Sequence, residues 1–178
     1  MPFYFANIKM KGKNIAMFNF FKKNKITETK LLAPITGRTI DLSDVPDKVF
    51  AEKLAGDGIA IDPVGDIIVA PADGELTLVF NTKHAFAITL SNGAELLVHI
   101  GIDTVSLDGE GFEQLIEAGT NVKAGTPIIK INREFILNKG FSLITPVLVT
   151  NMDLVKELNP SVGKEVTAGQ DQVISFTI

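Results

Sequence analysis

The sequence of 178 residues lacks cysteine altogether, has two histidines, and contains no apolar run near the ~20 residues of a membrane-spanning helix. Without cysteine, a disulfide framework, thiol catalysis and thiolate zinc sites are excluded. The apolar start at residues 1–6 is short and its lysines follow it, which is the wrong order for a secretory signal. We therefore expect a cytoplasmic protein.

The net charge of −4 is unevenly distributed along the chain. Residues 1–30 carry seven lysines and a single acid, Glu28, whereas residues 31–178 carry ten basic and twenty acidic residues. Because nucleic acids attract basic proteins, the acidic body argues against a nucleic-acid partner. It favours a basic protein partner, although solubility alone explains acidic charge equally well.

The change in composition predicts two regions. Residues 1–30 are expected to form a flexible basic N-terminal tail, and residues 31–178 a single folded domain. Within the tail, residues 17–23 place three phenylalanines beside two lysines, a short amphipathic pattern suited to weak contact with a membrane surface. A disordered tail is the favoured interpretation over a working anchor.

The folded region is rich in short runs of Val, Ile, Leu and Phe that alternate with turn residues, which predicts an all-β protein. Helical patterning is limited to short pieces at 111–118 and 152–158. Many short strands with close turns are typical of an antiparallel sandwich or barrel. The expected strands are 66–70, 75–80, 85–90, 94–100, 127–131, 143–149 and 172–178.

Two pairs of segments repeat in the same order and indicate an internal duplication. Residues 33–37 (Ala-Pro-Ile-Thr-Gly) are similar to 70–74 (Ala-Pro-Ala-Asp-Gly). Residues 122–125 (Val-Lys-Ala-Gly) are similar to 166–169 (Val-Thr-Ala-Gly). Pro and Gly recur at turns in any β protein, but two matched pairs favour duplication.

Both histidines lie at strand ends, on either side of the hairpin signal Asn92-Gly93. A two-residue turn centred between Asn92 and Gly93 pairs His99 with residue 86, and His84 then lies on the same face two residues further along. We therefore expect His84 and His99 to be diagonal neighbours. A register shift of one residue would remove this arrangement.

Two adjacent imidazoles can support more than one chemistry. One neutral ring nitrogen can attack phosphorus while the other ring donates a hydrogen bond to the phosphoryl oxygens. The Thr82 hydroxyl can fix the tautomer of His84, and the backbone around Gly101 that of His99. Alternatively, the pair can ligate zinc with Asp103 as a third ligand.

The run Leu-Val-His-Ile-Gly-Ile-Asp-Thr-Val at 97–105, followed by Gly-Glu-Gly-Phe at 109–112, resembles a family signature. It is similar to that of the glucose-type enzyme IIA (EIIA) of the bacterial phosphoenolpyruvate-dependent sugar phosphotransferase system, a β-sandwich family. The resemblance extends from about residue 31 to the C-terminus. Further matching stretches are 44–53, 56–61, 69–74, 81–86 and 145–153.

The resemblance implies a phosphotransferase component that acts through a phosphohistidine. His99 corresponds to the histidine phosphorylated on Nε2 by the phosphocarrier HPr, which then passes the group to a cysteine on the IIB domain of a sugar permease. His84 corresponds to the histidine that stabilises the phosphoryl group, and Thr82 to the hydroxyl that orients it. The implied partner surface comprises Asp47, Phe50, Glu52, Phe80, Leu97, Asp103 and Val105.

The resemblance implies no required cofactor. In some relatives the two histidines, here His84 and His99, bind zinc shared with a regulated partner, and permeases or kinases are regulated partners of such proteins. A regulatory binding module or a zinc-binding protein that uses the same surface is therefore the alternative function. A zinc hydrolase built on His84, His99 and Asp103 would lack a further imidazole as general base.

A biotinyl or lipoyl carrier is a further rival, because such duplicated hairpin domains share these turn motifs. It would need a modified lysine at a hairpin tip. The only similar motif, Lys9-Met10-Lys11, lies in the tail outside both repeats. The sequence does not indicate which sugar is transported.

Overall fold

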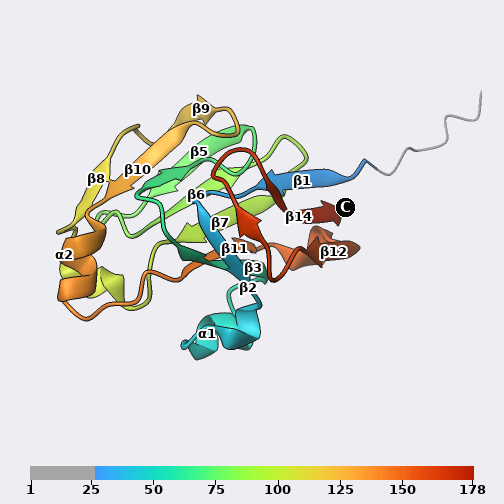
Figure 1. Ribbon diagram of the computed structural model, residues 1–178. Helices are drawn as coiled ribbons and strands as arrows, with labels where there is room; N and C mark the ends of the chain where they lie inside the picture. The colour runs from blue at the N-terminus through green and yellow to red at the C-terminus, as the bar shows by residue number, and fades with distance from the viewer. Residues whose placement is uncertain (1–26) are drawn as a thin grey trace, which may run out of the picture.

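The computed structural model describes residues 27–178, and Figure 1 shows the arrangement of its strands. Most of the predicted tail, including the amphipathic segment at 17–23, lies outside the described residues. Thr29 and Lys30, which the sequence places in the tail, belong to the first strand, where Thr29 pairs with Phe176.

The described residues form three antiparallel sheets. Their orders are β1-β14-β12, β4-β10-β8 and β13-β2-β3-β11-β7-β6-β5-β9. The bounds are β1 Thr29–Leu32, β2 Gly37–Ile40, β3 Asp57–Pro63, β4 Ile67–Val69, β5 Gly74–Val79, β6 Ala85–Thr89, β7 Glu95–His99, β8 Phe112–Gln114, β9 Thr120–Val122, β10 Pro127–Ile131, β11 Thr145–Val149, β12 Glu157–Pro160, β13 Glu165–Val166 and β14 Gln172–Thr177.

One continuous apolar core joins the three sheets. It includes Ile174 of β14, Ile129 of β10 and Val98 of β7, each at most 1% exposed. Figure 1 shows β1, β14 and β12 gathered at one end of the molecule and β8 and β10 at the other. The largest sheet begins at β13 and ends at β9 without pairing them, so the predicted antiparallel sandwich is confirmed and the sheet does not close into a barrel.

The predicted duplication is visible in equivalent hydrogen bonds. Gly125 donates its backbone N–H to the Ala70 carbonyl and Gly169 donates to the Ala33 carbonyl, each at 2.8 Å. The strand pairs are equivalent as well, because Gly74 is opposite Val122 and Gly37 is opposite Val166. Each repeated segment therefore occupies the same place in its own half of the fold.

Short helices cover parts of the sheets: α1 Lys48–Ala51, α2 Arg133–Asn138, and the 3-10 turns η1 Leu42–Asp44, η2 Thr104–Leu107 and η3 Met152–Leu154. In Figure 1, α1 lies beyond the end of β2. Asp47 caps α1 by accepting a hydrogen bond from the Val49 N–H at 2.7 Å. The sequence did not predict α1 or α2.

The predicted helix at 111–118 is wrong, because these residues contain strand β8. Gly111 has φ of +86°, which ends helical geometry there, and buried Phe112 pairs with Ile131. The helix predicted at 152–158 is confirmed only for its first three residues, Met152–Leu154. The chain then extends as β12, which pairs with β14.

A second, smaller apolar cluster lies on the outer face of the largest sheet. Leu42, Val45 and Phe50, from the η1–α1 segment, pack against Ala60 of β3 and Leu148 of β11 in this cluster. Leu97 of β7 packs against the same cluster. The η1–α1 segment therefore brings Phe50 to the face on which β7 presents Leu97.

Candidate functional site

His99 is the last residue of β7, and its side chain lies on the outer face of the sheet. Leu96 and Val98 are almost completely buried in the main core, whereas Leu97 and His99 alternate with them and are half-buried. Nδ1 of His99 lies 2.9 Å from the carbonyl oxygen of Gly101. Because a carbonyl only accepts, Nδ1 carries the proton and Nε2 keeps its lone pair.

His84 immediately precedes β6 and is 6% exposed. Lys83, before it, has φ of +57°, a left-handed conformation that is uncommon for a residue with a side chain. Nδ1 of His84 lies 2.6 Å from Oγ1 of Thr82, as the sequence predicted. When the hydroxyl donates to Nδ1, the ring proton lies on Nε2, which is then a hydrogen-bond donor.

The two imidazoles are in contact. Their centroids are 4.9 Å apart and their planes are inclined at 78°. Phe50 packs against His99 with centroids 5.0 Å apart, and Phe80 packs against His84 with centroids 5.3 Å apart. Four aromatic rings, one from α1, two from the connection between β5 and β6, and one from β7, therefore form one continuous row.

The predicted register of this hairpin is wrong. His99 pairs with Ala85 instead of residue 86, because the turn has three residues, with Gly93 at φ of +88°. Phe86 faces the main core and His99 the opposite face, so strict alternation from Phe86 would carry His84 away from His99. The rings meet because His84 lies before the strand, directly after the left-handed Lys83.

The environment keeps both rings neutral near pH 7. Burial, with a smaller contribution from the neighbouring His99, lowers the pKa of His84 to about 4. Burial also lowers the pKa of His99 from its ordinary value. The hydrogen bond to Gly101 and the carboxylates of Asp47 and Asp103 oppose this second shift.

The residues of the predicted partner surface differ in exposure. Phe80 is 38% exposed and Val105, in η2, is 51% exposed, whereas Phe50 is only 5% exposed. Glu52 is exposed at the C-terminal cap of α1. Phe50 is therefore mainly a support for the His99 ring, and the accessible apolar atoms belong to Phe80 and Val105.

The two carboxylates of the predicted surface lie close enough to His99 to affect its charge. Asp47 is half-buried at the start of α1. Asp103 is exposed and has φ of +58° in the segment between β7 and η2. Acidic side chains therefore border the His99 ring.

Residues 27–178 contain no group of three His, Cys, Asp or Glu side chains that could hold a metal ion. The alternative in which Asp103 completes a zinc site with His84 and His99 therefore lacks its third ligand within the described chain. No helix in the same part of the chain is long and apolar enough to cross a membrane.

Two supporting residues were missed in the sequence. Thr104 is fully buried and donates its hydroxyl to the Ile100 carbonyl at 2.5 Å. Gly109 packs against the backbone of Thr82, since a Cβ built there would lie 3.8 Å from the Thr82 Cα. Both belong to the signature segments, but nothing in their residue types distinguishes them from ordinary turn residues.

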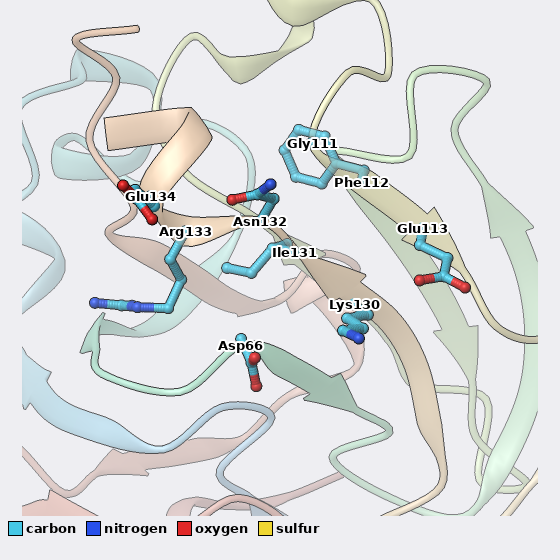
Figure 2. A pocket seen from close by; sticks show the side chains of 9 residues that line it. All are labelled: Asp66, Gly111, Phe112, Glu113, Lys130, Ile131, Asn132, Arg133 and Glu134. Atoms are coloured by element: carbon cyan, nitrogen blue, oxygen red, sulfur yellow. The ribbon is translucent and has the colours of Figure 1, made fainter. Parts of the chain in front are cut away.

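A separate hollow of about 620 Å³ lies between β8, β10 and the start of α2. Figure 2 shows Lys130, Arg133 and Asp66 around it. The guanidinium of Arg133 donates from Nη1 to the Pro63 carbonyl at 2.7 Å and to the Gly65 carbonyl at 3.2 Å. Neither histidine lines this hollow, and its arginine is occupied by backbone contacts.

Residues 29–155 match the family described as phosphoenolpyruvate-dependent sugar phosphotransferase system, EIIA 1. The chain belongs to this family. It is 42% identical over 155 residues to the "PTS system glucose-specific EIIA component" of Bacillus cereus, which covers 87% of this chain and 94% of that protein. The corresponding protein of Staphylococcus epidermidis is 44% identical over 149 residues, covering 84% and 90% of the two chains.

Two further relatives show the family in other contexts. The "PTS system N-acetylglucosamine-specific EIICBA component" of Klebsiella pneumoniae is 47% identical over 147 residues, which make up 83% of this chain and 23% of that protein. The solved structure of glucose permease IIA from Mycoplasma capricolum superposes with a TM-score of 0.78 at 40% identity. That match covers 84% of this chain and 96% of the other.

Proposed function

We propose that this EIIA family member is a phosphocarrier in which Nε2 of His99 holds the phosphoryl group. The hydrogen bond from Nδ1 to the Gly101 carbonyl carries the proposal, because it leaves Nε2 unprotonated. The lowered pKa of His99 keeps that nitrogen neutral near pH 7. A neutral ring nitrogen is the form that can attack phosphorus.

The donor in this proposal is the phosphohistidine of the small carrier protein HPr. Nε2 of His99 attacks the phosphorus atom, a new N–P bond forms, and the N–P bond of the donor breaks with its electron pair returning to the donor ring. In the second step a cysteine thiolate of a IIB domain attacks the phosphorus. The bond to Nε2 then breaks and His99 recovers its lone pair.

His84 is proposed to bind the phosphoryl oxygens. The contact with Thr82 at 2.6 Å supports a tautomer in which Nε2 of His84 carries a proton. A neutral donor 4.9 Å away, centroid to centroid, can stabilise the negative charge of the transferred group. Because the pKa of His84 is about 4, the ring donates this bond without carrying a positive charge near pH 7.

The surface around the histidines is proposed to bind both partners in turn. Phe80 and Val105 offer exposed apolar atoms, with Leu97 and Phe50 behind them. Asp47, Asp103 and Glu52 lie among these residues and would meet basic side chains of HPr. Exclusion of water by an apolar contact around His99 would favour transfer to the partner over hydrolysis.

The relatives also support a cellular setting for the proposed function. Relatives named as glucose-specific EIIA components support glucose as the sugar, and the relative named EIICBA supports a IIB domain as acceptor. Both exchanges would take place in the cytoplasm, where HPr and the IIB domain are accessible.

Transfer of radiolabelled phosphate from phosphorylated HPr to the full-length chain tests the proposal. The wild-type protein is expected to acquire a label that is lost in acid and retained in base, as a phosphohistidine is. His99→Ala is expected to acquire none. Label on His99→Ala would overturn the assignment of the nucleophile, and an unlabelled wild-type protein would overturn the function.

A further inference from the structure

The segment between β7 and η2 controls the direction of the Gly101 carbonyl group. Gly101 has φ of +79° and Asp103 has φ of +58°, so the backbone adopts the left-handed conformation twice within three residues. This path turns the Gly101 carbonyl back toward Nδ1 of His99. Such a path persists only where surrounding contacts hold it.

Two hydrogen bonds anchor this segment. The Ile102 N–H donates to the Ser142 carbonyl at 3.0 Å. The hydroxyl of Thr104, which is 0% exposed, donates to the Ile100 carbonyl at 2.5 Å. The first of these hydrogen bonds joins two backbone groups. Only the second, from Thr104, depends on a side chain.

The side chain of Thr104 also packs closely against the segment. A Cβ built on Gly101 would lie 2.5 Å from Cγ2 of Thr104 and 2.7 Å from the Ser142 carbonyl oxygen. The methyl group of Thr104 therefore lies directly against Gly101 while its hydroxyl holds Ile100. One buried side chain thus contacts both Ile100 and Gly101, where the bend that presents the carbonyl begins.

The hydrogen bond of Thr104 is also linked to the backbone of His84. Ile100 donates its N–H to the His84 carbonyl at 2.7 Å, and its own carbonyl accepts from Thr104. The peptide groups of Ile100 therefore connect Thr104 with the backbone of His84, while the Gly101 carbonyl connects the segment with the ring of His99.

We propose that Thr104 is a positioning residue for the phosphoryl acceptor: its hydroxyl holds the bend at which the Gly101 carbonyl selects the Nδ1–H tautomer of His99. Loss of the hydroxyl frees the Ile100 carbonyl and lets the bend relax. The Gly101 carbonyl then binds Nδ1 less well, and a fraction of the rings moves its proton to Nε2. Those rings have no lone pair with which to attack phosphorus.

The consequence for rate rests on the proposed function, whereas the consequence for the tautomer does not. Thr104→Val removes the hydroxyl and keeps the shape of the side chain. Thr104→Ser keeps the hydroxyl and removes the methyl group. Thr39→Val is the matched control, because Thr39 is 1% exposed and donates to the Ser161 carbonyl at 2.7 Å, but lies on β2, separated from β7 by β3 and β11.

The first readout is the pair of nitrogen-15 shifts of the His99 ring in the full chain at pH 7.5. We expect the wild type, Thr104→Ser and Thr39→Val to show one protonated Nδ1 and one unprotonated Nε2. We expect Thr104→Val to show shifts averaged between the two tautomers. The second readout is the rate of labelling by phosphorylated HPr, which we expect to fall in Thr104→Val alone, by about twofold if half of its His99 rings carry the proton on Nε2.

Wild-type ring shifts in Thr104→Val would overturn the proposal, including the case in which the rate falls while the shifts stay unchanged. If Thr104→Val does not fold, Thr104→Ala and Thr104→Ser provide the same comparison, since they differ only in the hydroxyl. Equal shifts in that pair would likewise overturn the proposal. If the ring shifts change but the wild-type chain takes no phosphate, the proposed function fails and the positioning role stands.

Discussion

His84 and His99 touch through their rings although His84 is not part of the strand that pairs with β7. The centroids are 4.9 Å apart, and the backbone link between them is the hydrogen bond from the Ile100 N–H to the His84 carbonyl at 2.7 Å. Burial disfavours a positive charge on the His84 ring, and the neighbouring His99 ring adds a smaller contribution in the same direction. The pair therefore has consequences for stability as well as for chemistry.

The first prediction concerns the stability of the fold at mildly acidic pH. The pKa of His84 is about 4 when folded, against an ordinary value of 6.5, so the unfolded chain binds more protons between these values. The contribution of His84 to the free energy of unfolding should therefore be fully present above pH 6.5 and be lost as the pH falls toward 4. Between pH 7 and pH 5 this residue alone should cost roughly 2 kcal/mol.

Urea unfolding at the two pH values measures this difference, and His84→Gln is the control. Glutamine does not titrate, so the drop between pH 7 and pH 5 should be smaller in the variant by about that amount. An equal drop in both proteins would show that His84 is not buried in its neutral form.

The second prediction separates the roles of the two histidines. His84→Gln retains Nε2 of His99 and should still accept phosphate from HPr. It should fail to pass the group to a IIB domain, because glutamine does not reproduce the imidazole donor next to the phosphoryl group. A chase of labelled protein with IIB measures this step. Transfer to IIB at the wild-type rate would exclude the proposed role of His84.

Much of the fold was predictable because its signals are local. Apolar runs bounded by turns located the strands near the site, and the repeated motifs indicated the duplication that Gly125 and Gly169 display. The helix predicted at 111–118 was wrong because a three-residue strand is too short to show its own period. Its assignment depends on pairing with β10, which the local sequence does not encode.

The site was predictable in content but not in geometry. Asn92-Gly93 indicated a hairpin, yet the turn has three residues, and the register shifted by one. The two rings are nevertheless in contact, because Lys83 adopts a left-handed conformation. A lysine in the sequence does not indicate that conformation. Likewise, the burial of Phe50 depends on packing against strands that are distant in sequence.

The third prediction distinguishes charge from apolar contact in docking. Asp103→Asn should lower the rate of transfer from HPr by about threefold at low salt and reduce its salt dependence, because the exposed carboxylate accelerates encounter. Asparagine tolerates the left-handed conformation, so the bend should persist. Phe80→Ala should lower affinity about tenfold with an unchanged salt dependence.

Stopped-flow transfer at two ionic strengths measures both effects. Asp66→Asn is the matched control, since its exposed carboxylate lies at the hollow of Figure 2, away from the histidines. Phe50→Ala is unsuitable, because loss of a buried phenylalanine should cost about 3–5 kcal/mol of stability. Equal salt slopes for the wild type and Asp103→Asn would contradict electrostatic steering by this residue.

The last prediction tests the contact at which the two halves of the duplicated fold meet. Gly169 has φ of +68°, and a Cβ built on it would lie 3.0 Å from the Cα of Gly125. Gly119 has φ of +86° with no atom within 4 Å of such a Cβ, so it is the matched control. Gly119→Ala should lower the free energy of unfolding only by the cost of a side chain in the left-handed conformation, about 1–2 kcal/mol.

Gly169→Ala should lower the free energy of unfolding by the same amount for its left-handed backbone. The clash should add about 1–3 kcal/mol, because the opposing group is backbone and cannot rotate away. Thermal or urea unfolding of the two variants gives the difference directly. Equal losses would mean that the Gly125 and Gly169 turns separate without cost, so their contact would not stabilise the junction of the repeats. A larger loss for Gly169→Ala, with phosphate uptake by His99 unchanged in the folded variant, would confine the effect to that junction.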